Sequence, residues 1–325
     1  MQKRDNMKIN PMEWVSQNKN MEITQKSENT YLYTMKSGSG TGNMLRQILF
    51  PGIDVMYNDF NMLKCISDFR PEARIIGIDH CMEGRIEWQN IDGTYMYIQQ
   101  GDLQINNKEH HSIGFGFPLG YYRGITIAIY LDEISDELKK LFREFSIDLK
   151  IINEKFCSSQ SPFMIRKNNS IEQIFKELYE NNKHEKMSYC KIKILELLLF
   201  LTITDPSKYN RPVKYFNKSQ VETVKNIMKY ISTNLETHFT LEELSSMFEI
   251  PLTSMKSCFK EVYGDSIYTY LKNLRMKKAA GLLIKTDKSI TSISSITGYT
   301  NTSKFSAAFK KIYGLTPSKY RKTNR

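Results

Sequence analysis

The feature that most constrains the fold is a fourteen-residue motif that occurs twice near the C-terminal end. The first copy, at 251–264, is PLTSMKSCFKEVYG, and the second, at 301–314, is NTSKFSAAFKKIYG. Their apolar residues are Met255 and Phe259 in the first copy, and Phe305, Phe309 and Ile312 in the second. Spacings of three and four predict a helix with one buried face in both copies. We therefore expect the same helical unit to occur twice in the chain.

A second helical pattern precedes each copy. Thr240 and Glu243 form a capping-box signature, and the pattern breaks near Glu249. In the second copy Ser289 is a candidate helix cap, and Gly298 turns the chain. Helix, turn and helix is the unit that places its second helix in the major groove of DNA. The sequence therefore predicts two helix-turn-helix units.

The outward positions of the two second helices are small or polar, as a groove-binding surface requires. We expect the residues that contact bases to be Thr253, Lys256, Ser257, Thr302, Ser303, Ser306 and Ala307. We expect the residues that contact phosphates to be Lys260, Lys310 and Lys311. The sequence gives no catalytic residue and no residue that holds a cofactor.

The segment between the two units, 266–286, has a buried apolar stripe and predicts one long helix. At about 1.5 Å a residue, its length is about 30 Å. The repeat of B-DNA is about 34 Å, so two helices held on this strut would enter successive major grooves. Either pattern alone could also belong to a small helical domain that does not bind DNA. The repetition of the pattern argues against this alternative.

Charge is concentrated in the same part of the chain. Residues 204–325 hold 21 Lys and Arg against 9 Asp and Glu, whereas residues 1–203 hold 25 against 26. A basic domain is typical of a partner that carries phosphates. Double-stranded DNA is therefore the expected partner.

Residues 219–323 resemble the C-terminal DNA-binding domain of the AraC/XylS family of bacterial transcription regulators. The resemblance is carried by FTLEELSSMFEIPLTSMKSCFKEVYG, YLKNLRMKKAAGLL and SISSITGYTNTSKFSAAFKKIYGLTPSKYRK. It implies seven helices, two helix-turn-helix units and a linker helix. It also implies a regulator, commonly an activator that works with RNA polymerase, and an N-terminal cupin-like barrel that binds an effector and forms a homodimer.

Three residues depart from the family pattern. Glu249 stands where many members have glycine, so the first turn has to form without glycine's freedom at positive φ. Ser257 and Ala307 stand where members often have arginine, which is the commonest specific partner of guanine. We therefore expect more dependence on Ser and Thr contacts and on DNA shape.

The remainder of the chain predicts an α+β fold with a barrel or sandwich. Strand signals at 73–89, 94–106 and 124–131 are followed by helical signals up to 203. The first predicted helix has Ile134, Leu138, Leu141 and Phe145 on one face, and a later one has Ile192, Ile194, Leu195, Leu198 and Leu199. The expected divisions are a polar segment with a flexible glycine-rich stretch at 1–47, an effector and dimerisation domain at 48–203, a linker at 204–218 and the DNA-binding domain at 219–323.

Two kinds of ligand site are open in the strand-rich region. An aromatic pocket for a small apolar effector would use Trp88, Tyr95, Tyr97, Phe115 and Phe117, although alternate strand positions are also typical of a core. A metal site or an enzyme domain would use His80, Cys81, Glu83, Glu109, His110 and His111. Neighbours on a strand point to opposite faces, which disfavours a shared ion, so we expect no metal. An effector-responsive regulator is favoured over a metal sensor or enzyme fused to a DNA-binding domain.

Five scattered cysteines without C-x-x-C spacing give no sign of a disulfide framework or a zinc site. The longest apolar run, at 195–203, is far shorter than the roughly 20 residues that span a bilayer. We therefore expect a cytoplasmic protein with no membrane partner.

Overall fold

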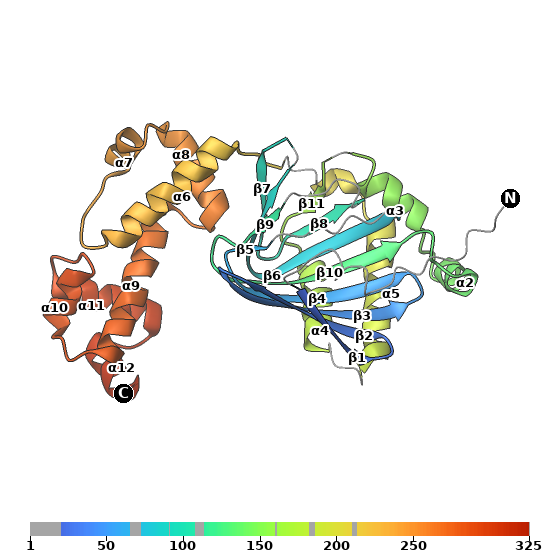
Figure 1. Cartoon of the computed structure of the whole chain (residues 1–325), viewed down its shortest axis with the longest axis horizontal. Coiled ribbons are helices and arrows are strands. Elements are labelled where there is room, and N and C mark those ends of the chain that lie inside the picture. Colours follow the sequence, from blue (N-terminus) through green and yellow to red (C-terminus); the bar gives the residue numbers. More distant parts are fainter. Residues whose placement is uncertain are drawn as a thin grey trace. The chain divides into compact units, whose positions relative to one another are not determined.

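The computed structural model describes residues 21–65, 73–90, 92–107, 114–159, 161–181, 186–209 and 213–324. The chain divides into two compact units, Met1–Tyr215 and Phe216–Arg325 (Figure 1). The first is built on a sheet and the second is helical, so the α+β fold class predicted from the sequence is confirmed. No helix among the described residues is long and apolar enough to cross a membrane.

The N-terminal unit is built on one curled antiparallel sheet. Its strands are β1 (Met21–Ser27), β2 (Thr30–Ser37), β3 (Gly40–Phe50), β4 (Ile53–Asn61), β5 (Lys64–Cys65), β6 (Ile75–Gln89), β7 (Tyr95–Gln99), β8 (Leu103–Asn106), β9 (Gly114–Gly116), β10 (Tyr122–Tyr130) and β11 (Phe163–Ile165). The main path runs β1, β2, β3, β4, β10, β6, β8, β11. The C-terminal part of the long strand β6 pairs with β7 and β9, and β5 pairs with β9.

The predicted N-terminal segment, 1–47, contains the strands β1 and β2, and its end falls within β3. β2 and β3 pair from Thr30↔Gln47 to Ser37↔Gly40, so Gly38 and Ser39 form a two-residue hairpin connection. The glycine-rich stretch that we expected to be flexible is thus a turn and the start of a strand. Residues 1–20 of that predicted segment lie outside the described residues.

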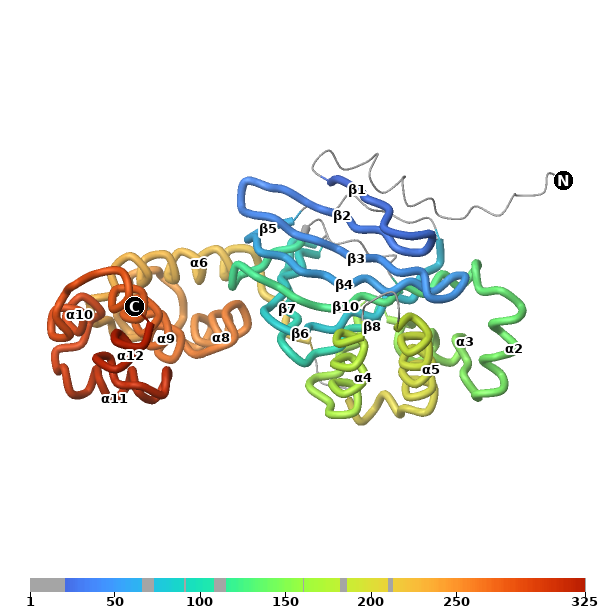
Figure 2. The backbone as a smooth tube through the Cα atoms, turned by 90° about the horizontal axis from the view of Figure 1, so that it is seen from below, coloured from blue at the N-terminus to red at the C-terminus, as the bar shows by residue number. Residues whose placement is uncertain are grey.

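Four helices cover one face of the sheet (Figure 2). They are α2 (Asp136–Glu144), α3 (Leu149–Phe156), α4 (Asn169–Glu180) and α5 (Met187–Ile203). Alternate residues of β10, namely Ile125, Ile127 and Ile129, are fully buried in the core between sheet and helices. Period-two alternation on a strand against period-3.6 faces on helices gives this two-layer core.

The opposite face of the sheet is polar near its centre. Asn58 Nδ2 donates to Thr126 Oγ1 at 3.0 Å, and Thr126 Oγ1 donates to Asp79 Oδ1 at 2.8 Å. Arg46 Nε donates to Asp54 Oδ2 at 2.7 Å, and both of these side chains are buried. Buried charges and amides are costly unless they are paired, so these bonds are needed to keep the face folded.

Two residues predicted to lie on the buried faces of the helices are exposed instead. Phe145, predicted to be buried, is the C-cap of α2 and is 48% exposed, and Phe142 is buried instead. Ile192 of α5 is 60% exposed, although its predicted partners Ile194 and Leu198 are fully buried. Both misplaced residues lie where the 3.6-residue period carries the apolar stripe past the edge of the contact.

The C-terminal unit consists of seven helices in the part of the chain that the structure describes. They are α6 (Lys218–Thr233), α7 (Leu241–Met247), α8 (Leu252–Tyr263), α9 (Ile267–Lys285), α10 (Ile290–Ile296), α11 (Thr302–Tyr313) and α12 (Pro317–Asn324). The predicted linker contains the short 3-10 helix η2 (Pro206–Tyr209), and Phe216, near its end, is already buried. Asn217 then caps α6 with a capping box to Gln220.

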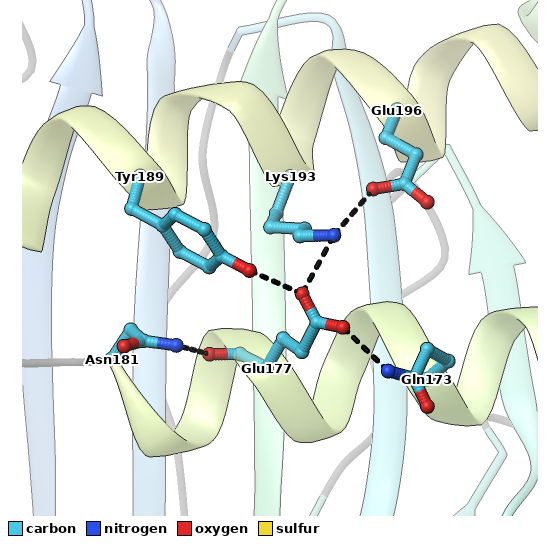
Figure 3. A network of polar contacts seen from close by, with 6 residues as sticks. All are labelled: Gln173, Glu177, Asn181, Tyr189, Lys193 and Glu196. Carbon is cyan, nitrogen blue, oxygen red and sulfur yellow. Dashed lines mark hydrogen bonds and ion pairs between the residues drawn. The ribbon is translucent and has the colours of Figure 1, made fainter.

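The carboxylate of Glu177 on α4 forms hydrogen bonds to two residues of α5 (Figure 3). Glu177 accepts hydrogen bonds from Tyr189 and, at 2.7 Å, from Lys193 of α5, and at 2.5 Å from Gln173 of its own helix. Lys193 also pairs with Glu196 at 2.8 Å. The bonds from Lys193, Tyr189 and Gln173 hold the pKa of Glu177 at about 2.

Glu177→Gln should lower the stability of the N-terminal unit at pH 7, because the pKa of Glu177 is depressed by folding. Such a carboxylate stabilises the fold above its ordinary pKa, about 4.5, and that contribution is lost as the pH falls toward 2. The gap in denaturant midpoint between wild type and variant should therefore narrow below pH 4.5. Glu180→Gln, at an exposed position of the same helix, is the control. A gap that stays constant from pH 7 to pH 2 would contradict the role of the charge.

Candidate nucleic-acid interface

The first helix-turn-helix unit is formed by α7 and α8, and its start is fixed by Thr240. Thr240 Oγ1 accepts the Glu243 N–H at 3.1 Å, and Glu243 Oε2 accepts the Thr240 N–H at 2.8 Å. The capping box predicted from the sequence is confirmed.

The turn between α7 and α8 is closed by a Schellman motif at Glu249. The Ile250 N–H donates to Ser245 O at 3.1 Å, and the Glu249 N–H donates to Ser246 O at 3.3 Å. Glu249 has φ of 50°, the left-handed conformation that favours glycine. The departure from the family pattern therefore leaves the turn geometry in place and adds strain at one residue.

The recognition helix of the first unit, α8, buries one face and exposes the other. Its buried residues are Met255, Cys258, Phe259, Val262 and Tyr263. Of the predicted contact residues, Thr253, Lys256 and Lys260 are exposed and Ser257 is half-buried. α8 packs against α6, α7 and α9, so its outward side chains are held on a rigid support.

The second unit repeats this construction with α10 and α11. Ser289 Oγ accepts the Ser292 N–H at 3.1 Å and caps α10. The Tyr299 N–H donates to Ser294 O, and the Gly298 N–H donates to Ser295 O, both at 2.9 Å. Gly298 has φ of 76° and occupies the place that Glu249 has in the first unit. The same Schellman turn is thus made once by glutamate and once by glycine.

The recognition helix of the second unit, α11, presents most of its predicted residues outward. Ser303, Ala307, Lys310 and Lys311 are exposed, and Thr302 and Ser306 are half-buried. Ile312 was predicted to hold the helix to the domain, but it is 40% exposed, and the fully buried Phe305 and Phe309 carry that contact.

Two polar residues at the start of α11 were missed in the sequence. The side chain of Asn301 caps the helix by accepting the N–H groups of Ser303 and Lys304, at 2.9 and 3.0 Å. Lys304 is exposed one position before Phe305, where the first unit has Ser254. Its spacing of three residues from Ala307, which was predicted to face outward, was the available signal, because residues three apart lie on one face of a helix.

An aromatic trio that follows each recognition helix also repeats at a spacing of fifty residues. Tyr270 lies edge-on to Phe259 at 5.9 Å and contacts Tyr263 at 5.2 Å. In the second unit Tyr320 contacts Phe309 at 5.2 Å and Tyr313 at 5.1 Å. Each trio fastens the end of a recognition helix to the helix that follows it.

The two units are joined by a buried arginine on α9. Arg275 Nε donates to Leu235 O at 2.8 Å, and its Nη2 donates to Thr237 O at 2.9 Å, in the loop that leads to α7. A Cβ added to Gly298 would lie 2.4 Å from Leu235 O and 2.8 Å from Arg275 Nη2. The turn of the second unit therefore packs directly on the entry loop of the first.

These features define the class of the C-terminal unit: it is a DNA-binding domain with two helix-turn-helix units. α9 contacts helices of both units, and its 19 residues give it a length of about 28 Å. The helix that the sequence predicts between the units is confirmed.

Comparison with known proteins supports this class for the C-terminal unit. A family model described as a helix-turn-helix domain matches residues 244–323. The lactose operon transcription activator of Staphylococcus xylosus is 27% identical over 71% of this chain and 80% of its own length. The probable transcriptional regulator LumQ of Photobacterium leiognathi is 24% identical over 51% of this chain and 64% of its own length, which is less than two thirds.

Among solved structures, the C-terminal domain of the response regulator AraT from Geobacillus stearothermophilus is 32% identical. The match covers 31% of this chain and 84% of that one, with a TM-score of 0.30. The C-terminal unit is therefore a DNA-binding domain of the AraC/XylS type, and the chain is similar to transcription regulators that carry such a domain.

The five aromatic residues predicted to line an effector pocket do not share one face. Trp88 contacts Phe115 edge-on at 4.9 Å, and both pack in the same core cluster as Phe117. Tyr95 and Tyr97 lie on the opposite face of β7, since Trp88 pairs with Met96, between them. The Tyr97 hydroxyl donates to Glu87 Oε2 at 2.7 Å.

The residues considered for a metal site are separated in the same way. His80 stacks on Phe175 of α4 at 4.2 Å, and Cys81 packs in the cluster on the other side of the sheet. Burial lowers the pKa of His80 to about 4. Glu109, His110 and His111 lie outside the described residues, and within the described part no three His, Cys, Asp or Glu side chains gather to hold a metal.

Glu249→Gly and Gly298→Ala should change local stability in opposite directions. Glycine at 249 removes the left-handed strain, so the amides of α7 and α8 should gain about 0.5–1 kcal/mol of protection. Alanine at 298 adds a Cβ against backbone and the Arg275 guanidinium, and should cost the second unit about 1–3 kcal/mol. Native-state hydrogen exchange of the intact chain measures both. Equal protection in Glu249→Gly and wild type would contradict strain at the turn.

Proposed function

We propose that this chain is a sequence-specific, effector-responsive transcription activator whose two helix-turn-helix units enter successive major grooves. One observation carries the proposal. Two recognition helices with small, polar outward faces are fixed to a single connecting helix of about 28 Å, close to the 34 Å repeat of B-DNA. One polypeptide then contacts DNA as a dimer of single units would.

The proposal gives each outward residue a role. The residues that contact base edges are Thr253, Lys256, Ser257, Thr302, Ser303, Ser306 and Ala307. The residues that contact phosphates are Lys260, Lys310 and Lys311, each of them exposed. Ala307 offers only a methyl group, which suits contact with a thymine methyl. Lys304 adds a further cation at the start of α11.

The roles of the two helices are tested by an equivalent pair, Thr253 of α8 and Ser303 of α11, which are both exposed. Thr253→Ala should change base preference in one half of the site and Ser303→Ala in the other half. Loss of one base contact should cost about 1 kcal/mol, roughly fivefold in discrimination at that base. Selection from a random duplex pool with each variant measures the change. Recovery of the wild-type site by both variants would contradict the assignment.

The N-terminal unit is proposed to bind the effector on the polar face of its sheet. Gln104 is buried in this face, and its Oε1 has no hydrogen-bond partner among the described residues. The hydrogen-bonded set of Asn58, Thr126 and Asp79 lies nearby, because Gln104 pairs with Asp79 across the strands. A small polar molecule would satisfy the unpaired amide oxygen, whose burial alone is costly.

A ligand found by thermal-shift screening of polar metabolites should lose its effect in Gln104→Leu. Binding to the folded state raises the melting temperature by mass action, so removal of a ligand contact removes part of the shift. The nearby Gln99→Leu, half-buried at the end of β7, is the matched control. An undiminished rise in melting temperature in Gln104→Leu would contradict effector binding at this face.

The remaining partners follow from the regulator's role. An activator works with RNA polymerase, in the cytoplasm where DNA is found, and the proposal assigns the chain no catalytic step. We also propose that the outer face of α5 forms a homodimer contact. It exposes Ile192 at 60% and Ile203 at 72%, and apolar side chains exposed on one helix favour a partner surface.

A further inference from the structure

The two helix-turn-helix units share a fold but differ in charge. Residues 240–264 hold four carboxylates and two lysines, a net charge of −2. Residues 289–314 hold three lysines and no carboxylate, a net charge of +3. Binding to DNA without regard to sequence comes almost entirely from neutralised phosphates. The two units should therefore contribute unequally to the sequence-independent affinity for DNA.

Three of the carboxylates of the first unit lie on α7 or in the turn after it. The carboxylate of Glu243 is held by the capping box with Thr240, and the backbone of Glu249 is held by the Schellman turn. Glu242 is exposed beside them on α7. In a helix-turn-helix unit the first helix crosses the DNA backbone, so these carboxylates approach phosphates when α8 enters the groove.

The corresponding surface of the second unit carries no such charge. Its first helix, α10, has the sequence ITSISSI, with only Ser and Thr as polar residues, and its turn is Gly298. Its recognition helix carries Lys304 and Lys311 where the first has Ser254 and Glu261. Lys260 and Lys310 are at equivalent positions, so only their surroundings differ.

We infer that the second unit anchors the chain on any duplex, whereas the first unit enters its groove only where the bases match. The first unit is then the half that separates an operator from other DNA. Repulsion between its carboxylates and the phosphates has to be offset by base contacts, and a non-matching sequence supplies none. This inference rests on the proposed function, because it requires both units to contact DNA.

Two matched variants of the full chain, Lys260→Gln and Lys310→Gln, test the inference. Each is measured on the duplex selected by wild type and on duplexes of random sequence, across a range of salt concentrations. Each phosphate contact contributes about 0.9 to the slope of log K against log salt. On random duplexes Lys310→Gln should reduce the magnitude of this slope by about 0.9, and Lys260→Gln should leave it unchanged. On the selected site both should lower it by about 0.9.

A gain-of-contact variant addresses the cause. Glu242→Gln with Glu243→Gln removes two charges, and glutamine at 243 can still complete the capping box. In this background Lys260→Gln should begin to lower the slope on random duplexes. Circular dichroism of each variant confirms that the helices remain.

The outcomes separate the inference from the proposed function. Equal effects of Lys260→Gln and Lys310→Gln on random duplexes would overturn the inference and leave two DNA-binding units. No effect of either change on the selected site, or no sequence selected by wild type, would overturn the proposed function itself.

Discussion

The guanidinium of Arg275 is the interaction on which the DNA-binding unit depends. It donates to the carbonyl oxygens of Leu235 and Thr237, and Gly298 packs against the same carbonyl and the same guanidinium. Burial lowers the pKa of Arg275, so its charge is held there at a cost that the two carbonyl acceptors offset. Together with α9, this contact joins the two units and limits the angle between their recognition helices.

Within that fixed arrangement, the two units differ in surface charge. Two fully buried positions match between the two recognition helices, namely Met255 with Phe305 and Phe259 with Phe309. Their exposed residues differ, since packing does not constrain them. Glu261 and Lys311 occupy equivalent positions with opposite charge. The repeated buried positions thus preserve the geometry of the unit, while its exposed positions are free to differ in charge.

Much of the DNA-binding unit could be predicted from the sequence, because helical period and capping are local properties. The capping box at Thr240 and the helix between the two units follow from residues within a few turns of each other. Ile312 was mispredicted because period alone cannot show where a contact ends, and its place on α11 lies past the edge of the core. The conformation of Glu249 required the structure, since residue type predicts the opposite.

Less of the N-terminal unit could be predicted, because strand pairing joins residues far apart in the sequence. The hairpin at Gly38 and Ser39 has the composition of a flexible linker, and only its pairing partners identify it as a turn. The aromatic set divided for a related reason: Tyr95 and Tyr97 alternate with Met96, which shares a face with Trp88. A pocket predicted from residue type alone ignores this alternation.

The proposed function requires that one rigid polypeptide hold two recognition helices one turn of DNA apart. The most direct test inserts about five base pairs, half a helical turn, between the two halves of the selected site and measures the affinity of the full chain. The affinity should fall to that of a site with one half scrambled, because the displaced half then faces away. Unchanged affinity after the insertion would contradict it, since the two units would then be flexibly joined or only one of them would contact DNA.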